Sequence, residues 1–574
     1  MASGRLDGLP LAMKWWGWGD RAKRFQIEGH PDLAEFLKTR LETTLEQEFP
    51  PVSLESILLA PSRLDRAQVD GLERILGEYG ISRDKLSRLE HAMGKSYRDV
   101  VRSRKGEVSC PPDAVLYPSG EEEIGKILEW ASEHEVAVVP FGGGTSVVGG
   151  VEALGAEHHR AVISLDLCRL SRILHVDERS RTVRAQAGIR GPSLEEGLSG
   201  RGFTLGHFPQ SFEYSTLGGW VATRSAGQQS TLYGKIEHMV QSLRMIHPGG
   251  TLETLSVPAR AAGPDWNQIV TGSEGILGVI TEVTLKLWPA PVKRRIGAFF
   301  FRDFREGAEA SRKFLQNGLV PATLRVSDPE ETQFGMILRP RSEDWKKQAF
   351  DHTGVWALEK MGYRQGKRCL MILGFEGDPE STDSDWKHAR RICSDHGGFY
   401  LGRKPGMMWY RDRFEHPYLR DTLMDKGVLI DTVETSTTWE NLLPLYEALQ
   451  KILVESIRQT GVQGIVMAHL SHCYPSGSSL YFIFLAKQVQ GEEMEQWWAI
   501  KKAASECILA HHGTISHHHG IGIDHARWAE KEHGPSAMKG LKGLKNSLDP
   551  KGIMNPGKIL PVPVCIQREE PRIP

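Results

Sequence analysis

The alternation of apolar and polar positions divides the chain into regions of different periodicity. Residues 1–105 carry apolar positions at helical spacing and predict a mainly helical N-terminal region. In residues 106–291, short apolar runs alternate with amphipathic stretches, as strands and helices do in mixed domains. Residues 292–510 repeat that alternation, and residues 511–574 form a C-terminal segment. We therefore expect an α+β protein in which two mixed domains follow a helical region.

The individual elements are placed by the period and length of each apolar run. In the first mixed region we expect strands at 114–117, 136–139, 161–166, 173–177, 182–187 and 279–287, and helices at 121–133 and 194–201. In the second we expect strands at 296–301, 322–326, 368–375, 432–437 and 480–485, and helices at 304–317, 385–396 and 492–510. Outside these regions, helices are expected at 32–49, 67–78 and 528–546.

The composition is typical of a globular protein in a reducing compartment. A chain of 574 residues is too long for a single core and should hold two or three domains. Its 71 Lys and Arg against 72 Asp and Glu give a net charge of −1, which does not support nucleic-acid binding. The seven cysteines form no Cys-x-x-Cys pair, which argues against a structural zinc site. With no apolar run of about 18 residues, no signal-peptide core and no peroxisomal tripeptide, we expect a cytoplasmic location.

Three tryptophans near the N-terminus allow two interpretations. Trp15, Trp16 and Trp18 could lie at a membrane interface, which would make the protein peripherally membrane-associated. They could instead belong to a terminal arm that packs its aromatic side chains onto a neighbouring domain. We favour the second interpretation.

A glycine-rich stretch, Pro140–Gly150, follows the strand expected at 136–139. It holds three consecutive glycines and then Thr145 and Ser146. Glycine lets backbone N–H groups approach an anion closely and hydroxyls add donors, so the stretch is typical of a pyrophosphate-binding loop. It is no P-loop, because no Lys follows the glycines, and no dinucleotide fingerprint, because Val147 replaces the third glycine. For this stretch alone, a glycine-rich hairpin remains the alternative.

Two later segments form a specific pattern with this loop. One runs from Pro209 to Gly227 and the other from Gly272 to Thr281. In order and spacing, the three segments resemble the flavin-contacting segments of the vanillyl-alcohol-oxidase (PCMH) type FAD-binding family, and residues 548–558 resemble the C-terminal end of that family. The resemblance implies non-covalent FAD between two small sheets and a separate α+β cap domain that binds substrate. The implied FAD-binding residues are Pro140, Phe141, Gly142, Gly143, Gly144, Thr145, Ser146, Gln210, Ser211, Phe212, Glu213, Tyr214, Ser215, Thr216, Thr223, Arg224, Ser225, Ala226, Glu274, Gly275, Ile276, Leu277, Gly278, Val279 and Ile280.

Nearly the whole chain resembles one branch of this family, the alkyldihydroxyacetonephosphate synthases of ether-lipid synthesis. The most specific piece is the run Ser516–Gly520, a serine, three histidines and a glycine, which the related 2-hydroxyacid dehydrogenases do not usually show. The resemblance implies that the acyl group of 1-acyl-dihydroxyacetone phosphate is exchanged for a fatty alcohol without net oxidation. A phosphorylated lipid and a fatty alcohol are therefore the implied substrates, and we also expect a homodimer.

The same resemblance assigns catalytic roles to individual residues. Tyr481 matches the active-site acid/base, although a tyrosine in an alternating strand is usually a core residue. His517, His518 and His519 are implied to line the active site, with at least one of them involved in proton transfer. A nearby imidazolium and an arginine would lower the cost of deprotonating the phenol.

Two arginines are candidates for binding the substrate. Arg420 matches the substrate-contacting arginine of the branch, with a surface Arg-Asp pair as the alternative. Arg325 lies in mid-strand between apolar residues, where an unpaired charge would be unfavourable. We therefore expect it to have a partner, which could be the substrate phosphate, the flavin or a carboxylate. The guanidinium group suits phosphate because it can donate two parallel hydrogen bonds.

His469 and His472 depart from the ether-lipid branch, which carries Arg and Gln at these positions. They could support a divalent ion, as in the 2-hydroxyacid dehydrogenase branch, or tune substrate binding, which we favour. The three adjacent histidines are not expected to share one ion, because neighbouring side chains diverge, and no metal site is predicted. An FAD-dependent 2-hydroxyacid dehydrogenase or oxidase remains the alternative function.

Overall fold

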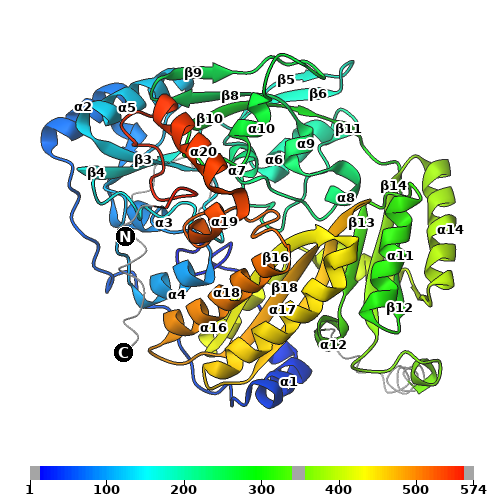
Figure 1. Cartoon of the computed structure of the whole chain (residues 1–574). Helices are drawn as coiled ribbons and strands as arrows, with labels where there is room; N and C mark the ends of the chain where they lie inside the picture. Colours follow the sequence, from blue (N-terminus) through cyan, green and yellow to red (C-terminus); the bar gives the residue numbers. More distant parts are fainter. Residues whose placement is uncertain (1–12, 339–355, 562–574) are drawn as a thin grey trace.

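Three main β-sheets organise the computed structural model, which describes residues 13–338 and 356–561 of the chain (Figure 1). A four-stranded and a five-stranded sheet share one hydrophobic core in the first half of the chain. A seven-stranded sheet with its own core makes up most of the second half. The α+β class and the two small sheets expected from the sequence are confirmed.

The N-terminal region consists of helices linked by irregular chain. They are α1 (Pro31–Leu41), α2 (Arg66–Leu76), α3 (Lys85–Glu90) and α4 (Tyr97–Lys105). The arm before α1 buries Trp15 and Trp18, each only 6% exposed, and the backbone N–H of Trp18 donates to Asp421 at 2.9 Å. These tryptophans therefore pack against the rest of the protein, as the favoured interpretation expects. No helix in the described residues is long and apolar enough to cross a bilayer.

The four-stranded sheet presents the glycine-rich loop at one strand end. Its order is β1-β2-β4-β3, with β1 (Ile81–Ser82), β2 (Ala114–Leu116), β3 (Val136–Phe141) and β4 (Ala161–Asp166). Strands β2 and β3 both run parallel to β4, with helix α5 (Glu121–His134) between them in sequence as the crossover. Every residue of β4 is buried, as expected for a parallel strand covered on both faces. The loop leaves the carboxyl end of β3, which is where open parallel sheets bind ligands.

The five-stranded sheet is antiparallel and has the order β5-β6-β10-β8-β9. Its strands are β5 (Ile173–Asp177), β6 (Thr182–Gln186), β8 (Val240–His247), β9 (Gly250–Glu253) and β10 (Val279–Lys286). The connections hold α6 (Gly191–Ser199), α7 (Leu217–Thr223), α8 (Ser230–Tyr233), α9 (Ile236–Met239) and α10 (Trp266–Val270), and a separate pair of strands, β7 (Phe203–Thr204) and β11 (Trp288–Pro289). The sequence analysis did not predict β8 or β9.

The seven-stranded sheet is antiparallel throughout and has the order β15-β12-β14-β13-β17-β18-β16. Its strands are β12 (Lys293–Phe301), β13 (Thr323–Ser327), β14 (Cys369–Gly377), β15 (Phe399–Gly402), β16 (Val428–Thr438), β17 (Gly464–Tyr474) and β18 (Gly477–Lys487). The helices around it are α11 (Phe304–Gln316), α12 (Pro329–Ile337), α14 (Pro379–Asp395), α15 (Lys404–Asp412), α16 (His416–Asp425), α17 (Trp439–Gln459) and α18 (Glu493–Ala510).

The two faces of this sheet have different neighbours. On β17, Val466 and Ala468 belong to the core that includes α11, α17 and α18, which lie in front of the sheet in Figure 1. The alternate residues Ile465 and Met467 pack with α1. Because side chains alternate across a strand, His469 lies on the α1 face. This face also carries the candidate site.

The C-terminal segment returns to the first sheet. After the short helix η3 (Ala526–Trp528), helices α19 (Ala529–His533) and α20 (Pro535–Leu548) lead the chain back to β3. There the N–H of Val138 donates to Ile553 at 2.8 Å, and the N–H of Asn555 donates to Val138 at 2.9 Å. The end of the described chain is therefore paired with the strand that leads into the glycine-rich loop.

Candidate active site

A row of side chains crosses four adjacent strands of the seven-stranded sheet. Glu434 on β16 pairs with Tyr481 on β18, Tyr481 pairs with His469 on β17, and His469 pairs with Ser327 on β13. Cross-strand partners point to the same face of a sheet. Arg325 lies two residues before Ser327 and points to this face as well. Antiparallel pairing therefore brings together residues that are up to 156 positions apart in the sequence.

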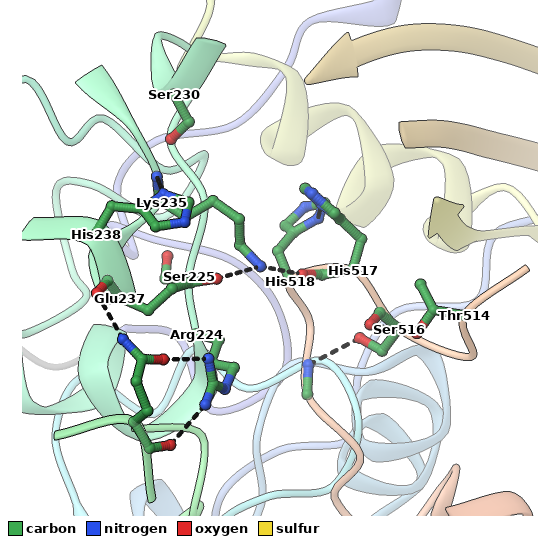
Figure 2. Close-up of polar contacts among 12 residues, drawn as sticks. Arg224, Ser225, Ser230, Lys235, Glu237, His238, Thr514, Ser516, His517 and His518 are labelled. Atoms are coloured by element: carbon green, nitrogen blue, oxygen red, sulfur yellow. Dashed lines mark hydrogen bonds and ion pairs between the residues drawn. The ribbon is translucent and has the colours of Figure 1, made fainter. Parts of the chain in front are cut away.

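The histidine loop, Ser516–Gly520, is wound around Glu434. The Glu434 carboxylate accepts hydrogen bonds from the backbone N–H groups of His517 (2.8 Å), His518 (3.1 Å) and His519 (3.0 Å), and from the Ser516 hydroxyl (2.7 Å). The carboxylate is buried, with Glu434 only 4% exposed. Figure 2 shows Ser516, His517 and His518 along this loop. One buried side chain therefore fixes the position of all three histidines.

Glu434 is an anion at neutral pH. Burial opposes its ionisation, but the imidazole of His518, 3.3 Å away, holds its pKa well below the ordinary value. The histidines respond differently, because burial lowers the pKa of His519 to about 3 and that of His517 well below its ordinary value. These two rings are neutral near pH 7. The expectation of an imidazolium at these two positions is therefore wrong, since desolvation of the cation outweighs the attraction of Glu434.

The Tyr481 ring lies between His469 and the histidine loop. It stacks on His469 with ring centroids 4.9 Å apart and on His518 at 6.1 Å, and meets His519 edge-on at 5.6 Å. Burial raises the pKa of the Tyr481 phenol to about 12. The phenol is therefore protonated near neutral pH and can donate a hydrogen bond or a proton. The structure brings Tyr481 together with His518 and His519 of the triplet, and its catalytic role remains a prediction.

Arg325 has partners within the protein. Its Nη2 donates to Glu331 of α12 at 2.7 Å, and its Nη1 lies 2.9 Å from the Nε2 of His469. Although burial opposes ionisation of Glu331, Arg325 and His469 hold its pKa at about 2. Burial lowers the pKa of His469 to about 4. Of the three partners expected for Arg325, the structure contains the carboxylate.

Arg420, on α16, has donors that are not used by the protein. Its Nη1 donates to the carbonyl of Lys95 at 2.6 Å, whereas its Nε and Nη2 are buried with no hydrogen-bond partner among the described residues. A guanidinium stays charged even where burial lowers its pKa. A buried guanidinium edge with two free donors fits an anionic ligand. The role of Arg420 in binding a substrate phosphate remains a prediction.

A second group of histidines lies beside the row. His472 is located where the β17–β18 register shifts, stacks on His517 at 5.2 Å and meets His518 edge-on at 5.2 Å. The Nδ1 atoms of His517 and His518 are 3.0 Å apart, and Tyr474 Oη is 2.6 Å from His517 Nε2. Lys235 donates to the carbonyl of His517 at 2.5 Å (Figure 2). The expectation that neighbouring histidines diverge is wrong for His517 and His518, because their loop is bent and not extended.

The first two flavin segments are in close contact at Gly142 and Gly143. A Cβ atom on Gly142 would lie 2.2 Å from Thr216 Oγ1, and one on Gly143 would lie 2.1 Å from the carbonyl oxygen of Tyr214. Only glycine allows so close an approach. Thr216 also caps α7 by accepting a hydrogen bond from Gly219. The consecutive glycines are therefore required by the packing of these segments as well as by any ligand.

The third segment joins the glycine-rich loop to the chain that follows the histidines. Asn555 Nδ2 donates to the carbonyls of Glu274 (2.6 Å) and Gly150 (3.1 Å). The Glu274 carboxylate accepts from the N–H groups of Ile521 (2.6 Å) and Gly522 (2.7 Å), and burial raises its pKa to about 7. The Glu274 side chain is therefore bound to the protein.

The polar atoms along these segments fit FAD. The hydroxyls of Thr271 and Ser273 are buried with no hydrogen-bond partner among the described residues, and they lie directly before Glu274. Other predicted side chains bind the protein, since Gln210 donates to a backbone carbonyl and Arg224 donates to Gln268. These positions can offer FAD their backbone groups. Hydroxyl donors beside a glycine-rich loop at a strand end are what a pyrophosphate requires.

The sequence analysis did not predict three residues that shape this site, namely Glu434, Glu331 and Lys235. Strand β16 has only four apolar residues, Val428, Leu429, Ile430 and Val433, so an acid at Glu434 does not stand out in its sequence. The other two belong to polar stretches. The sequence context therefore gives no clear signal for any of the three.

Comparisons with known proteins agree with this geometry. Residues 112–256 match the FAD binding domain, and residues 290–559 match the C-terminal domain of FAD linked oxidases. The chain is 34% identical to the alkyldihydroxyacetonephosphate synthase of Dictyostelium discoideum, over 96% of this chain and 93% of that protein. It is 35% identical to the enzyme of that name from Trypanosoma brucei brucei, over 98% and 94%. A solved alkyldihydroxyacetonephosphate synthase matches with a TM-score of 0.83 and 34% identity, over 95% and 98%.

The fold and the two matched domains define a flavoprotein of the FAD-linked oxidase type, with FAD as its cofactor. Within that class, the chain belongs to the alkyldihydroxyacetonephosphate synthase family. The family resemblance noted in the sequence is thereby confirmed.

Proposed function

We propose that the protein is an alkyldihydroxyacetonephosphate synthase, which replaces the acyl group of 1-acyl-dihydroxyacetone phosphate with a long-chain fatty alcohol. The bond between the substrate carbon and the carboxylate oxygen breaks, and a bond from that carbon to the alcohol oxygen forms. A fatty acid is released, and no net oxidation occurs. Family membership over nearly the whole chain supports this reaction class. The observation that carries the proposal is the position of Tyr481 between His469 and the histidine loop.

We assign the proton transfer to Tyr481 and the histidine loop. The exchange requires a group that accepts and returns protons at the reacting carbon and at the alcohol. Tyr481 is protonated near neutral pH, and His518 and His519 lie against its ring. Because Glu434 anchors the loop by its backbone, the imidazoles can exchange protons without moving away from Tyr481. Burial keeps His519 neutral, so its ring has one N–H donor and one acceptor nitrogen.

We assign binding of the substrate phosphate to Arg420. Its two free donors provide the parallel hydrogen bonds that a phosphate accepts. Arg325 acts in a different way, because its guanidinium is shared between Glu331 and His469. It positions His469 against Tyr481. We therefore propose a substrate-binding role for Arg420 and a positioning role for Arg325.

FAD would be held by the three segments described above. The backbone of Gly142–Ser146, the hydroxyls of Thr145 and Ser146, and those of Thr271 and Ser273 supply donors for its phosphates. When bound, FAD supplies the reversible electron acceptor that the exchange requires. Lys235, on the flavin side, contacts the carbonyl of His517. This hydrogen bond links the FAD-binding half of the protein to the histidine loop.

The proposed function is tested by mixing the purified protein with 1-acyl-dihydroxyacetone phosphate and hexadecanol in the absence of oxygen. We expect fatty acid and the alkyl ether in equal amounts, with flavin absorbance restored at the end of the reaction. A flavin that stays reduced after addition of a 2-hydroxy acid, with no ether formed, would support the alternative dehydrogenase or oxidase. Absence of both products would contradict the proposal.

Four further features remain part of the proposal: the domain boundaries at residues 105, 291 and 510, a homodimer, a cytoplasmic location and a peripheral membrane contact. The six cysteines in the described residues are all free, which supports a reducing compartment. The lipid nature of both substrates supports a membrane contact. That contact would have to use side chains other than the buried Trp15 and Trp18.

A further inference from the structure

One group of histidines is used only in part by the proposed reaction. His472, His517 and His518 each place an imidazole nitrogen within 4.8 Å of the others. His472 and His517 are buried, with 5% and 9% of their surface exposed. The Nδ1 atom of His472 has no hydrogen-bond partner among the described residues. A buried polar atom without a partner is unfavourable unless it serves a ligand.

We propose that these three imidazoles bind a divalent first-row transition ion such as Zn²⁺ or Co²⁺. Imidazole nitrogen is a preferred ligand of these ions. Tetrahedral coordination with metal–nitrogen bonds of about 2.0–2.1 Å places ligand nitrogens about 3.3 Å apart. The Nδ1 atoms of His517 and His518 are 3.0 Å apart and therefore already close to ligand spacing. A rotation of the His472 side chain closes the remaining distance.

The surroundings support the ring orientations that a metal requires. Metal-binding histidines usually donate their second N–H to a neighbouring acceptor. When Nδ1 of His517 binds the ion, its proton resides on Nε2, where Tyr474 Oη lies 2.6 Å away and accepts it. No proton is gained or lost by the neutral ring, because only the position of its N–H changes. Tyr474 can therefore accept a hydrogen bond from the tautomer that leaves Nδ1 free.

The charges around the three imidazoles also favour a cation. The Glu434 carboxylate lies 3.3 Å from the imidazole of His518. Lys235 is the nearby positive group, and Glu237 pairs with it at 3.1 Å. Glu237 thus offsets the charge of Lys235, and the Glu434 carboxylate is a further negative group beside His518. Three histidine ligands leave one tetrahedral position open, which water or a phosphate or carboxylate oxygen can fill.

A substitution at His472 tests the proposed ion site without changing the histidine loop, because His472 lies on β17. His472→Gln removes one proposed ligand while keeping a polar side chain. His175→Gln is the matched control, because His175 lies exposed on β5. Both variants lose one imidazole, and only the first loses a proposed ligand.

The test is ion binding by the FAD-loaded protein after treatment with a chelator. We expect one Zn²⁺ per chain by calorimetry, and Co²⁺ absorption bands of a tetrahedral site at wavelengths beyond the flavin bands. His472→Gln should weaken Zn²⁺ binding about 100-fold, and His175→Gln should leave it unchanged. Flavin absorbance and the unfolding temperature of His472→Gln establish that it is folded.

Equal Zn²⁺ affinity in wild type and His472→Gln would overturn the proposal. So would the absence of tetrahedral Co²⁺ bands in the wild type, a result that needs no variant to fold. Because binding is measured without substrate, the outcome does not depend on the proposed reaction.

Discussion

Glu434 and Tyr481 are direct partners across β16 and β18, and the carboxylate of Glu434 holds the loop that covers the ring of Tyr481. One pair of neighbouring strands therefore places both the proposed proton-transfer residue and the anchor of its surroundings. A substitution at either position should affect the same catalytic step.

Tyr481→Phe tests the proton-transfer role. The substitution keeps the ring between His469 and His518 and removes only the hydroxyl. We expect normal FAD content and a turnover lower by roughly 10²-fold or more. His518→Ala should cause a similar loss, and the double variant should be little worse than either single one, because residues that act as a unit are not additive. Steady-state kinetics with the acyl substrate measures all three. Multiplicative losses would mean that the two residues act separately.

Glu434→Gln tests the anchor of the histidine loop. The amide has one acceptor oxygen and no charge, so we expect an unfolding free energy lower by about 1.5–3 kcal/mol and a reduced turnover. Because the folded-state pKa of Glu434 is depressed, its contribution to stability is present above the unfolded value of about 4.3 and is lost only as the pH falls below it. The difference from wild type in urea unfolding should therefore be constant from pH 8 to 6. The exposed Glu440→Gln is the matched control.

Arg420→Ala tests the phosphate clamp. Loss of a buried, charge-assisted contact should lower kcat/KM by the equivalent of about 2–5 kcal/mol, with FAD content unchanged. Arg325→Ala should also lower activity, but it leaves Glu331 buried without its cation and should destabilise the fold as well. Thermal unfolding separates the two cases. Arg391→Ala, an exposed arginine, should change neither quantity. Unchanged kcat/KM in Arg420→Ala would remove Arg420 from the substrate site.

Gly143→Ala tests the glycine-rich loop. The new Cβ atom would lie 2.1 Å from the carbonyl oxygen of Tyr214, so the first two flavin segments must separate. We expect the purified variant to lose flavin absorbance. Gly125→Ala on α5 meets no atom within 4 Å and should retain FAD, with stability raised by about 0.5–1 kcal/mol. Full flavin content in Gly143→Ala would mean that the loop does not hold the cofactor.

His469 should make the fold sensitive to acid. Its pKa is about 4 in the folded protein and about 6.5 in an unfolded chain. Between pH 6.5 and pH 4 the His469 imidazole is protonated in the unfolded chain but not in the folded protein. The unfolding free energy is therefore intact above about pH 6.5 and falls by about 3 kcal/mol on acidification to about pH 4. Urea unfolding across this range should show a shallower pH dependence for His469→Gln than for wild type. His175→Gln should follow wild type.

The elements that could be predicted are those with a clear local pattern. Strands β4 and β5 have the bounds expected from their apolar runs, because turn residues enclose each run. Strand β17 was not predicted, since His469, Ser471 and His472 interrupt its apolar pattern. Those polar residues occupy the strand because they line the site, and only pairing with β13 and β18 shows that they belong to the sheet.

The residues of the site also fall into those that could be predicted from the sequence and those that could not. Tyr481 and the histidine triplet could be found because a family pattern carries them. The anchoring role of Glu434 could not be found, because it depends on a loop that begins 82 residues later and folds back over β16. Sequence spacing gives no rule for such a contact. The partners of Arg325 were likewise open until the strand order placed His469 beside it.

The pairing of Val138 with Met554 has a consequence for biosynthesis. When the ribosome has made the first 300 residues, both sheets of the FAD-binding half are complete in sequence. The strand that leads into the glycine-rich loop is paired with β4 but still lacks the bridge to Met554 on its other edge, and the carbonyls of Gly150 and Glu274 still lack the amide of Asn555. These groups are supplied by residues near the end of translation. Stable cofactor loading should therefore follow release of the finished chain from the ribosome.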